Sequence, residues 1–335
     1  MPRSHATEIA RARFYEQRDD SRLQCRLCPH NCVIAEGTSG FCQVRQNDGG
    51  EMALPFYGAA SALGIDPIEK KPLYHFYPGR PILSIGFLGC FLRCPFCQNY
   101  RISQSNVAHT EYVSPDDLVA DARRQGSFGV AYTYNEPAIH AEYVLDAAGR
   151  ASAAGLKNVL VTAGYLNEEP AKELYGAMDA ANIDLKGFQE DFYRRELKGG
   201  LAEVLRGIEI AAERCHVEIT TLVIPGKNDS DEETREIAKF IAGIDRRIPL
   251  HMSAYYPTYT YTTRATSPEH LLSRIEIARE YLDYVYPGNI SAPANTYCTS
   301  CGRLLVERSG YRTRVSGIAG GHCAVCGAEV PIVGV

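Results

Sequence analysis

Three cysteines in the first third of the chain have the spacing of a metal-cluster loop. Cys90, Cys94 and Cys97 are arranged as C-x3-C-x2-C, directly after an apolar run at 82–87 that predicts a buried strand. Three thiolates in one short loop can hold three irons of a [4Fe–4S] cube, which leaves the fourth iron open to a substrate or cofactor. A zinc knuckle lacking one ligand, or a cluster with a remote fourth cysteine, has the same spacing. The position after a strand and the aromatic Phe96 before the last cysteine favour the open cluster.

Eight of the other nine cysteines form two further clusters, one near each end of the chain. The first follows C-x2-C-x3-C-x9-C and the second consists of two C-x2-C-Gly pairs; their members are Cys25, Cys28, Cys32 and Cys42, and Cys298, Cys301, Cys323 and Cys326. Four thiolates close a tetrahedral site, so the N-terminal set predicts either zinc or a second iron–sulfur cluster. The paired knuckles are typical of a zinc ribbon and predict structural zinc. The isolated Cys215 is interpreted as a small buried apolar residue without a role.

Between the outer cysteine clusters, short β-branched runs alternate with amphipathic stretches. Strands are predicted at 82–87, 129–134, 158–161, 181–185, 217–224, 250–254 and 284–286, and helices at 114–125, 138–154, 168–178, 201–214, 231–242 and 268–282. This alternation predicts an α/β fold with a parallel sheet, in which functional groups gather at the carboxyl ends of the strands. We expect an N-terminal cysteine-rich metal-binding segment (1–74), a partial TIM-like (β/α)6 barrel (75–295) and a zinc-ribbon-like C-terminal module (296–335).

Composition limits the remaining classes of function. The net charge of −5 and the pI near 6.0 argue against a general nucleic-acid binder, which would present a basic surface. No apolar run is long enough to span a bilayer, and the first residues lack the apolar core of a signal peptide. We therefore expect a cytoplasmic protein that binds neither membranes nor nucleic acid.

The loop around Cys90 resembles that of radical S-adenosylmethionine (SAM) enzymes, especially the pyruvate formate-lyase activating enzyme group. The resemblance implies that the open iron binds SAM and that further SAM-binding groups follow successive strands. The residues that match these positions are Phe96, Asn135, Glu136, Thr162, Asp184, Lys186, Gly226 and His251. Strand alternation places Asp184 and Lys186 on one face, where an acid and a cation suit a zwitterionic methionine and ribose hydroxyls.

Three residues, at two strand ends, depart from the activase pattern. Tyr134 and Asn135 stand where activases have two glycines before the glutamate, and Val161 stands where they have an aspartate before the threonine. An Asn side chain still offers a carbonyl oxygen to an ammonium group. The departures leave the predicted SAM chemistry intact and make the substrate harder to infer.

The combination of motifs along the chain resembles the AmmeMemoRadiSam-system radical SAM enzymes over residues from about 25 to 327. The motifs are Cys-x-Leu-Cys-Pro-His-x-Cys from Cys25, Tyr-Asn-Glu-Pro from Tyr134 and Asn-Thr-Tyr-Cys from Asn295. The resemblance implies reductive cleavage of SAM to a 5′-deoxyadenosyl radical, which abstracts hydrogen from a small-molecule substrate. It also implies a reductant such as flavodoxin or ferredoxin. The alternatives are a glycyl-radical enzyme activase, which acts on a partner protein, and a non-catalytic zinc and iron–sulfur assembly protein.

Overall fold

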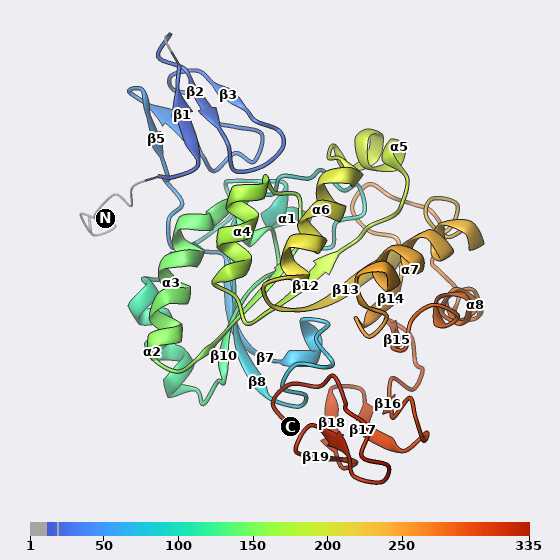
Figure 1. Cartoon of the computed structure of the whole chain (residues 1–335). Helices are drawn as coiled ribbons and strands as arrows, with labels where there is room; N and C mark the ends of the chain where they lie inside the picture. Colours follow the sequence, from blue (N-terminus) through green and yellow to red (C-terminus); the bar gives the residue numbers. More distant parts are fainter. Residues whose placement is uncertain (1–11, 19) are drawn as a thin grey trace.

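A largely parallel sheet forms the centre of the computed structural model, which describes residues 12–18 and 20–335 (Figure 1). The strand order is β15-β14-β13-β12-β11-β10-β8-β7; the edge strand β7 pairs antiparallel with β8, and all the other pairs are parallel. The bounds are β7 Ala62–Pro67, β8 Pro81–Gly86, β10 Gly129–Tyr132, β11 Lys157–Thr162, β12 Ala180–Asp184, β13 His216–Val223, β14 Leu250–Ala254 and β15 Val285–Gly288. Because the parallel strands follow chain order, their carboxyl ends meet at one rim of a partial barrel.

Helices connect the strands and cover the outer face of the sheet (Figure 1). Their bounds are α1 Tyr100–Ser103, α2 Pro115–Arg124, α3 Ala141–Ala153, α4 Glu168–Gly176, α5 Glu190–Phe192, α6 Leu201–Ala212, α7 Asp231–Asp245 and α8 Pro268–Arg279. Ser114, Ser230 and Ser267 begin α2, α7 and α8 by accepting a backbone N–H at 3.0, 3.1 and 3.2 Å. Each serine satisfies one of the N–H groups that a helix start leaves free.

The predicted α/β alternation is confirmed, because each predicted strand and helix of the barrel has a counterpart within a few residues. The strand β7 was not predicted. It lies inside the segment expected to form the N-terminal part, but it pairs with β8 along its length, from Ala62 opposite Gly86 to Pro67 opposite Pro81. As a half-exposed edge strand with Gly64 and a terminal proline, it lacks the apolar run of a buried strand. The sheet therefore begins before residue 75, and the division into three parts stays a prediction.

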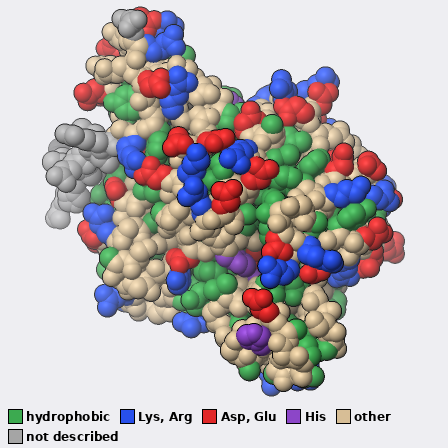
Figure 2. Space-filling model, in the orientation of Figure 1, with side chains coloured by type: hydrophobic (Ala, Val, Ile, Leu, Met, Phe, Trp, Pro, Cys, Tyr) green, Lys and Arg blue, Asp and Glu red, His purple; other side chains and the backbone are tan. Residues whose placement is uncertain are grey.

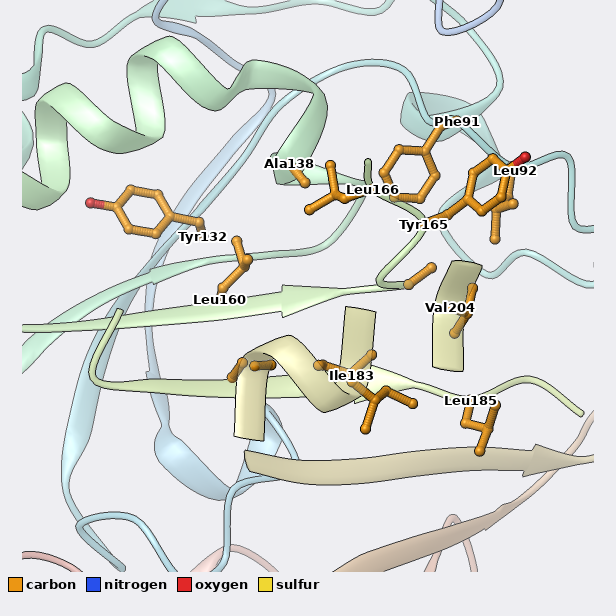
Figure 3. Packing of buried hydrophobic residues seen from close by; sticks show 14 of the residues in the cluster. Phe91, Leu92, Tyr132, Ala138, Leu160, Tyr165, Leu166, Ile183, Leu185 and Val204 are labelled. Atoms are coloured by element: carbon orange, nitrogen blue, oxygen red, sulfur yellow. The ribbon is translucent and has the colours of Figure 1, made fainter. Parts of the chain in front are cut away.

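Two apolar layers enclose the sheet. Outer-face residues such as Leu160 and Ile183 belong to a buried cluster with Val204 of α6, and Tyr165 in the loop after β11 lies beside Phe91 in the same cluster (Figure 3). On the inner face, a smaller cluster closes the floor of the barrel; it contains Ile68, Leu73, Phe76, Ile82, Phe128, Ala131, Val159 and Ala180. This floor leaves the space at the carboxyl ends of the strands for a ligand.

Two small β modules flank the barrel on opposite sides in Figure 1. The N-terminal module contains β1 Tyr15–Gln17, β2 Leu23–Cys25, β3 Val33–Ile34, β4 Gln46–Asp48 and β5 Glu51–Ala53. Its anchor is Arg45, which is buried and donates to both oxygens of Glu142 on α3 at 3.0 and 2.8 Å. A short pair, β6 Ala59–Ala60 with β9 Glu111–Tyr112, follows outside the main sheet.

The C-terminal module is a ribbon that packs on the barrel floor. It contains β16 Thr296–Tyr297, β17 Leu304–Ser309, β18 Arg312–Val315, β19 Ile318–Ala319 and β20 His322–Cys323. The ring of buried His75 lies 3.0 Å from the carbonyl of Pro331 through Nδ1 and 2.7 Å from the Tyr286 hydroxyl through Nε2. Arg308 donates to the carbonyl of Tyr74 at 2.7 Å. These contacts join the ribbon to the segment around Tyr74 and His75, whose neighbours Leu73 and Phe76 belong to the floor cluster.

The surface agrees with the modest net charge, because acidic and basic side chains are intermixed over the face shown in Figure 2. None of the helices in the described part of the chain combines the length and apolar character needed to cross a bilayer.

Candidate functional site

A cavity of about 620 Å³ opens at the carboxyl ends of the strands. Nine of the eleven residues predicted for the central site line it: Cys90, Cys94, Phe96, Cys97, Asn135, Glu136, Thr162, Asp184 and Lys186. The remaining two, Gly226 and His251, are not among its lining residues. The fold therefore brings together residues that are up to about a hundred positions apart in sequence, and it leaves two predicted contacts elsewhere.

Two of the three sulfurs in the cysteine loop have polar partners. The backbone N–H of Leu92 donates to Cys90 Sγ at 3.3 Å, and Cys97 Sγ lies 3.0 Å from the hydroxyl of Ser103. Such contacts stabilise thiolates that bind metal. Phe96 is buried and stacks parallel to Phe192, with ring centroids 6.3 Å apart, so it fixes the loop between the second and third cysteines.

The three thiols fit a cluster with one open iron. No fourth cysteine is among the described residues that line the cavity, so the protein supplies three sulfur ligands there. The rest of the lining offers carboxylate and hydroxyl oxygens, which are groups that bind an amine or a ribose rather than iron–sulfur.

Glu136 follows β10 and is the buried carboxylate of the site. It accepts the Thr162 hydroxyl at 2.7 Å, the Ala163 N–H at 2.9 Å and the Ala138 N–H at 3.1 Å. Burial raises the pKa of Glu136 to about 7, and these hydrogen bonds oppose the rise only partly. A cation bound beside Glu136 would provide a counter-charge and favour the ionised carboxylate.

The two positions that depart from the activase glycines have structural roles. Tyr134 has a left-handed backbone (φ 71°), packs its ring on Gly86 and donates its hydroxyl to Asp66 at 2.7 Å. A side chain at Gly86 would collide with this ring. Asn135 accepts the N–H of Phe87 at 2.9 Å and donates to the carbonyl of Gly89 at 2.8 Å. Its amide therefore holds the start of the cysteine loop.

Asp184 and Lys186 lie together on the cavity wall, as strand alternation predicts. Their side chains form an ion pair at 2.9 Å. The carbonyl of Lys186 accepts the Asn228 amide at 2.7 Å, which ties the end of β12 to the loop after β13. In that loop Gly226 has φ 73° and donates its N–H to Asp229 at 2.8 Å, so its observed role is to form the turn.

His251 points into the barrel, but one layer below the cavity. On β14 it shares the inner face with Ser253, which does line the cavity. His251 Nε2 donates to Glu218 at 2.6 Å, and the same carboxylate accepts the N–H groups of Tyr74 and His75 at 2.9 and 2.7 Å. Strand alternation predicts which face of β14 His251 lies on, but not how far along the barrel axis it lies from the cavity. A role for His251 in binding SAM stays a prediction.

A charged group that the sequence did not reveal lines the cavity from the end of β7 and the segment after it. Asp66 forms ion pairs with Lys70 at 3.0 Å and with buried Lys71 at 2.8 Å, and all three line the cavity. Lys70 lies 5.3 Å from the ring of Tyr311, a residue of the ribbon that also lines the cavity. The close spacing of these charges after an apolar segment was the available signal.

The C-terminal cysteines form a compact four-sulfur site. The sulfurs of Cys298 and Cys326 are 3.6 Å apart, those of Cys301 and Cys323 are 3.7 Å apart, and all four lie within 4.8 Å of one another. Four thiolates at about 2.3 Å from a tetrahedral ion lie about 3.8 Å from each other. The spacing fits a single metal ion. The N-terminal cysteines Cys25, Cys28, Cys32 and Cys42 gather around β2 and β3 in the other module.

Comparison with known proteins agrees with this geometry. The radical SAM superfamily model matches residues 84–241, and the chain belongs to this superfamily of enzymes. It is 38% identical to the uncharacterized protein MJ0808 of Methanocaldococcus jannaschii, over 96% of this chain and 99% of that protein. The superfamily fold implies a [4Fe–4S] cluster and SAM, and the residues described above fit both groups.

Two solved structures share the fold. A radical SAM methyltransferase from Sphaerobacter thermophilus has a TM-score of 0.51 and 17% identity, covering 68% of this chain and 71% of that one. SuiB of Streptococcus suis, bound to S-adenosylmethionine, has a TM-score of 0.50 and 13% identity, covering 67% of this chain and 53% of that one. At this identity the likeness concerns the fold alone.

Proposed function

We propose that the protein cleaves SAM reductively at a [4Fe–4S] cluster bound by Cys90, Cys94 and Cys97 and abstracts hydrogen from a small-molecule substrate. The observation that carries the proposal is that three cysteines after β8 and the buried Glu136 after the neighbouring strand β10 line the same cavity. When bound, the cluster and SAM supply a 5′-deoxyadenosyl radical. The remaining chemistry is binding and orientation by the side chains of this chain.

Each of these side chains has a defined task. Glu136, backed by Thr162, accepts the amino group of the methionine part, and Asn135 keeps the cysteine loop in register with β10. The Asp184–Lys186 pair receives the carboxylate and the ribose hydroxyls. Phe96 excludes water from the side of the loop, because its ring is buried against Phe192.

A small substrate is favoured over a protein by the size of the cavity. About 620 Å³ lies within the range of small-molecule pockets, and SAM must occupy part of it. Tyr311 of the ribbon and Lys70 line part of its wall. The glycyl-radical activase remains the alternative, since an extended loop of a partner protein can enter such an opening.

Three further parts complete the proposal. Zinc occupies the ribbon site of Cys298, Cys301, Cys323 and Cys326, because its tetrahedral thiolate geometry matches the sulfur spacing. A flavodoxin or ferredoxin supplies electrons. Membership of the AmmeMemoRadiSam-system enzymes rests on the terminal cysteine motifs and the Tyr-Asn-Glu-Pro segment.

The proposal is tested by anaerobic reconstitution with iron and sulfide, followed by SAM and dithionite. We expect 5′-deoxyadenosine and methionine from the wild type, none from Cys94→Ala, and wild-type amounts from the matched variant Cys215→Ser. Absence of 5′-deoxyadenosine from the wild type would leave the non-catalytic assembly protein as the better reading. Addition of low-molecular-mass cell extract should increase the yield more than the protein fraction does; the opposite result would favour the activase.

A further inference from the structure

The two outer cysteine clusters differ in how closely their sulfurs approach. Only the C-terminal four form a group of ligand atoms within 4.8 Å among the described residues, and all twelve cysteines are described. The N-terminal four are therefore spaced more widely than the ligands of one tetrahedral ion. A polynuclear iron–sulfur cluster is larger than a single ion and needs its thiolates further apart.

The surroundings of the two clusters differ as well. In the N-terminal module, Cys25, Cys28 and Cys42 are buried, with 6, 8 and 8% of their surface exposed, and they pack with apolar residues. Cys32 is half-buried, so none of the four described N-terminal cysteines is exposed, whereas in the ribbon Cys298 and Cys323 are buried but Cys301 and Cys326 are exposed. An apolar, enclosed set of thiolates suits a redox cluster, whose potential depends on burial and on hydrogen bonds to sulfur. The N–H of Phe41 provides such a bond to Cys32 Sγ at 3.4 Å.

The N-terminal cysteines contact the central loop directly. A Cβ atom placed on Gly89, the neighbour of Cys90, would lie 2.5 Å from the carbonyl oxygen of Cys42, so these two backbones touch. Arg93 joins the same loops, because its guanidinium donates to the carbonyls of Cys90, at 2.8 Å, and of Phe41. The ring of His30 lies 2.8 Å from the carbonyl of Phe91 through Nε2. Three contacts thus pack the residues beside one cysteine set against those beside the other.

We propose that Cys25, Cys28, Cys32 and Cys42 bind a second iron–sulfur cluster, which passes single electrons to the cluster of Cys90, Cys94 and Cys97. In each transfer the N-terminal cluster is oxidised by one electron and the central cluster is reduced by one. A one-electron protein donor of the flavodoxin or ferredoxin class then reduces the N-terminal cluster again. The relay rests on the proposed function, whereas the second cluster does not.

The second cluster is tested in the full chain with the variant Cys90→Ala/Cys94→Ala/Cys97→Ala, after anaerobic reconstitution. Iron, acid-labile sulfide and zinc are counted together, and the reduced protein is examined by electron paramagnetic resonance. We expect iron and sulfide in equal amounts, one zinc per chain and a reduced-cluster signal. Two zinc ions with neither iron nor sulfide would overturn the proposal. Because these readouts need no SAM, they are independent of whether the wild type cleaves it.

A second variant guards against misfolding of the first. Cys28→Ser/Cys32→Ser should lose the iron and sulfide of one cluster relative to the wild type, while Cys215→Ser keeps both clusters. The relay is tested by freezing samples at intervals after mixing with reduced flavodoxin. The paramagnetic signal of the central cluster should grow at least about tenfold more slowly in Cys28→Ser/Cys32→Ser than in Cys215→Ser. Equal metal content or equal reduction rates in these two variants would contradict the cluster or the relay, respectively.

Discussion

The carboxylate of Glu136 and the hydroxyl of Thr162 meet at 2.7 Å across the ends of two neighbouring parallel strands. Neither residue alone distinguishes a ligand site from an ordinary helix start or a buried threonine. Their contact fixes the buried carboxyl beside the cysteine loop, where its pKa is raised to about 7 by burial.

The first prediction concerns SAM binding to the reconstituted protein. Below pH 7 Glu136 is largely protonated, so ionisation favours binding of the amino group as the pH rises. Between pH 6 and 7.5 the affinity of the wild type should increase about eightfold more than that of Glu136→Gln. At pH 7.5 the variant should bind about 10–100-fold more weakly, through loss of a charge-assisted hydrogen bond. Calorimetry measures both values, with the exposed change Glu213→Gln as control; parallel pH profiles would contradict the role of Glu136.

The second prediction concerns the buried ion pair of Arg45 and Glu142. Glu142→Gln leaves the guanidinium without its counter-charge, so the free energy of unfolding should fall by about 3–5 kcal/mol. The exposed pair of Arg206 and Glu209 is the matched control, and Glu209→Gln should change stability by less than about 1 kcal/mol. Denaturant unfolding of the anaerobically loaded proteins compares the two. If Glu142→Gln lowered the free energy of unfolding no more than Glu209→Gln does, the N-terminal module would not depend on the Arg45–Glu142 pair.

The third prediction concerns His75, whose ring joins the barrel to the ribbon. Because a carbonyl only accepts, Nδ1 donates to Pro331 and Nε2 accepts from the Tyr286 hydroxyl, which requires a neutral ring. Burial lowers the pKa of His75 to about 3. Between about pH 6.5 and pH 3, His75 therefore binds a proton in the unfolded chain but not in the native state. The contribution of neutral His75 to the free energy of unfolding is lost as the pH falls through this range.

His75→Gln isolates this effect from other titrating groups. The variant should be less stable than the wild type at pH 7, and the difference should shrink by about 2 kcal/mol at pH 5. Urea unfolding at both pH values gives the comparison. A difference that stays constant with pH would mean that His75 titrates alike in the folded and unfolded chain.

The fourth prediction concerns the ribbon metal. The ribbon has a small core that includes Cys298 and Cys323, two of the proposed ligands, so a bound zinc ion would supply much of its stability. Cys323→Ser should lose one zinc per chain and become sensitive to trypsin within residues 296–335, while the barrel stays intact. Cys215→Ser should retain the zinc. Unchanged zinc content in Cys323→Ser would exclude this residue as a ligand.

The sequence by itself determined the barrel and the cysteine loop. Alternating β-branched and amphipathic runs specify strands and helices through local periodicity, and parallel strands in chain order bring Cys90, Glu136 and Asp184 to one rim. The spacing of the three local cysteines, together with Phe96 and the position after a strand, was enough to indicate the central cluster.

Only the tertiary structure decided depth and proximity. His251 and Ser253 share one strand face, yet His251 forms a hydrogen bond with Glu218 below the cavity, whereas Ser253 lines the cavity. The segment Ala62–Pro67 is identified as the edge strand β7 only by its pairing with β8 in the folded chain. The same holds for the cysteines: their spacing along the chain does not separate zinc from iron–sulfur at Cys25 to Cys42. The distances between sulfurs, and the contact of Cys42 with Gly89, exist only once the chain has folded.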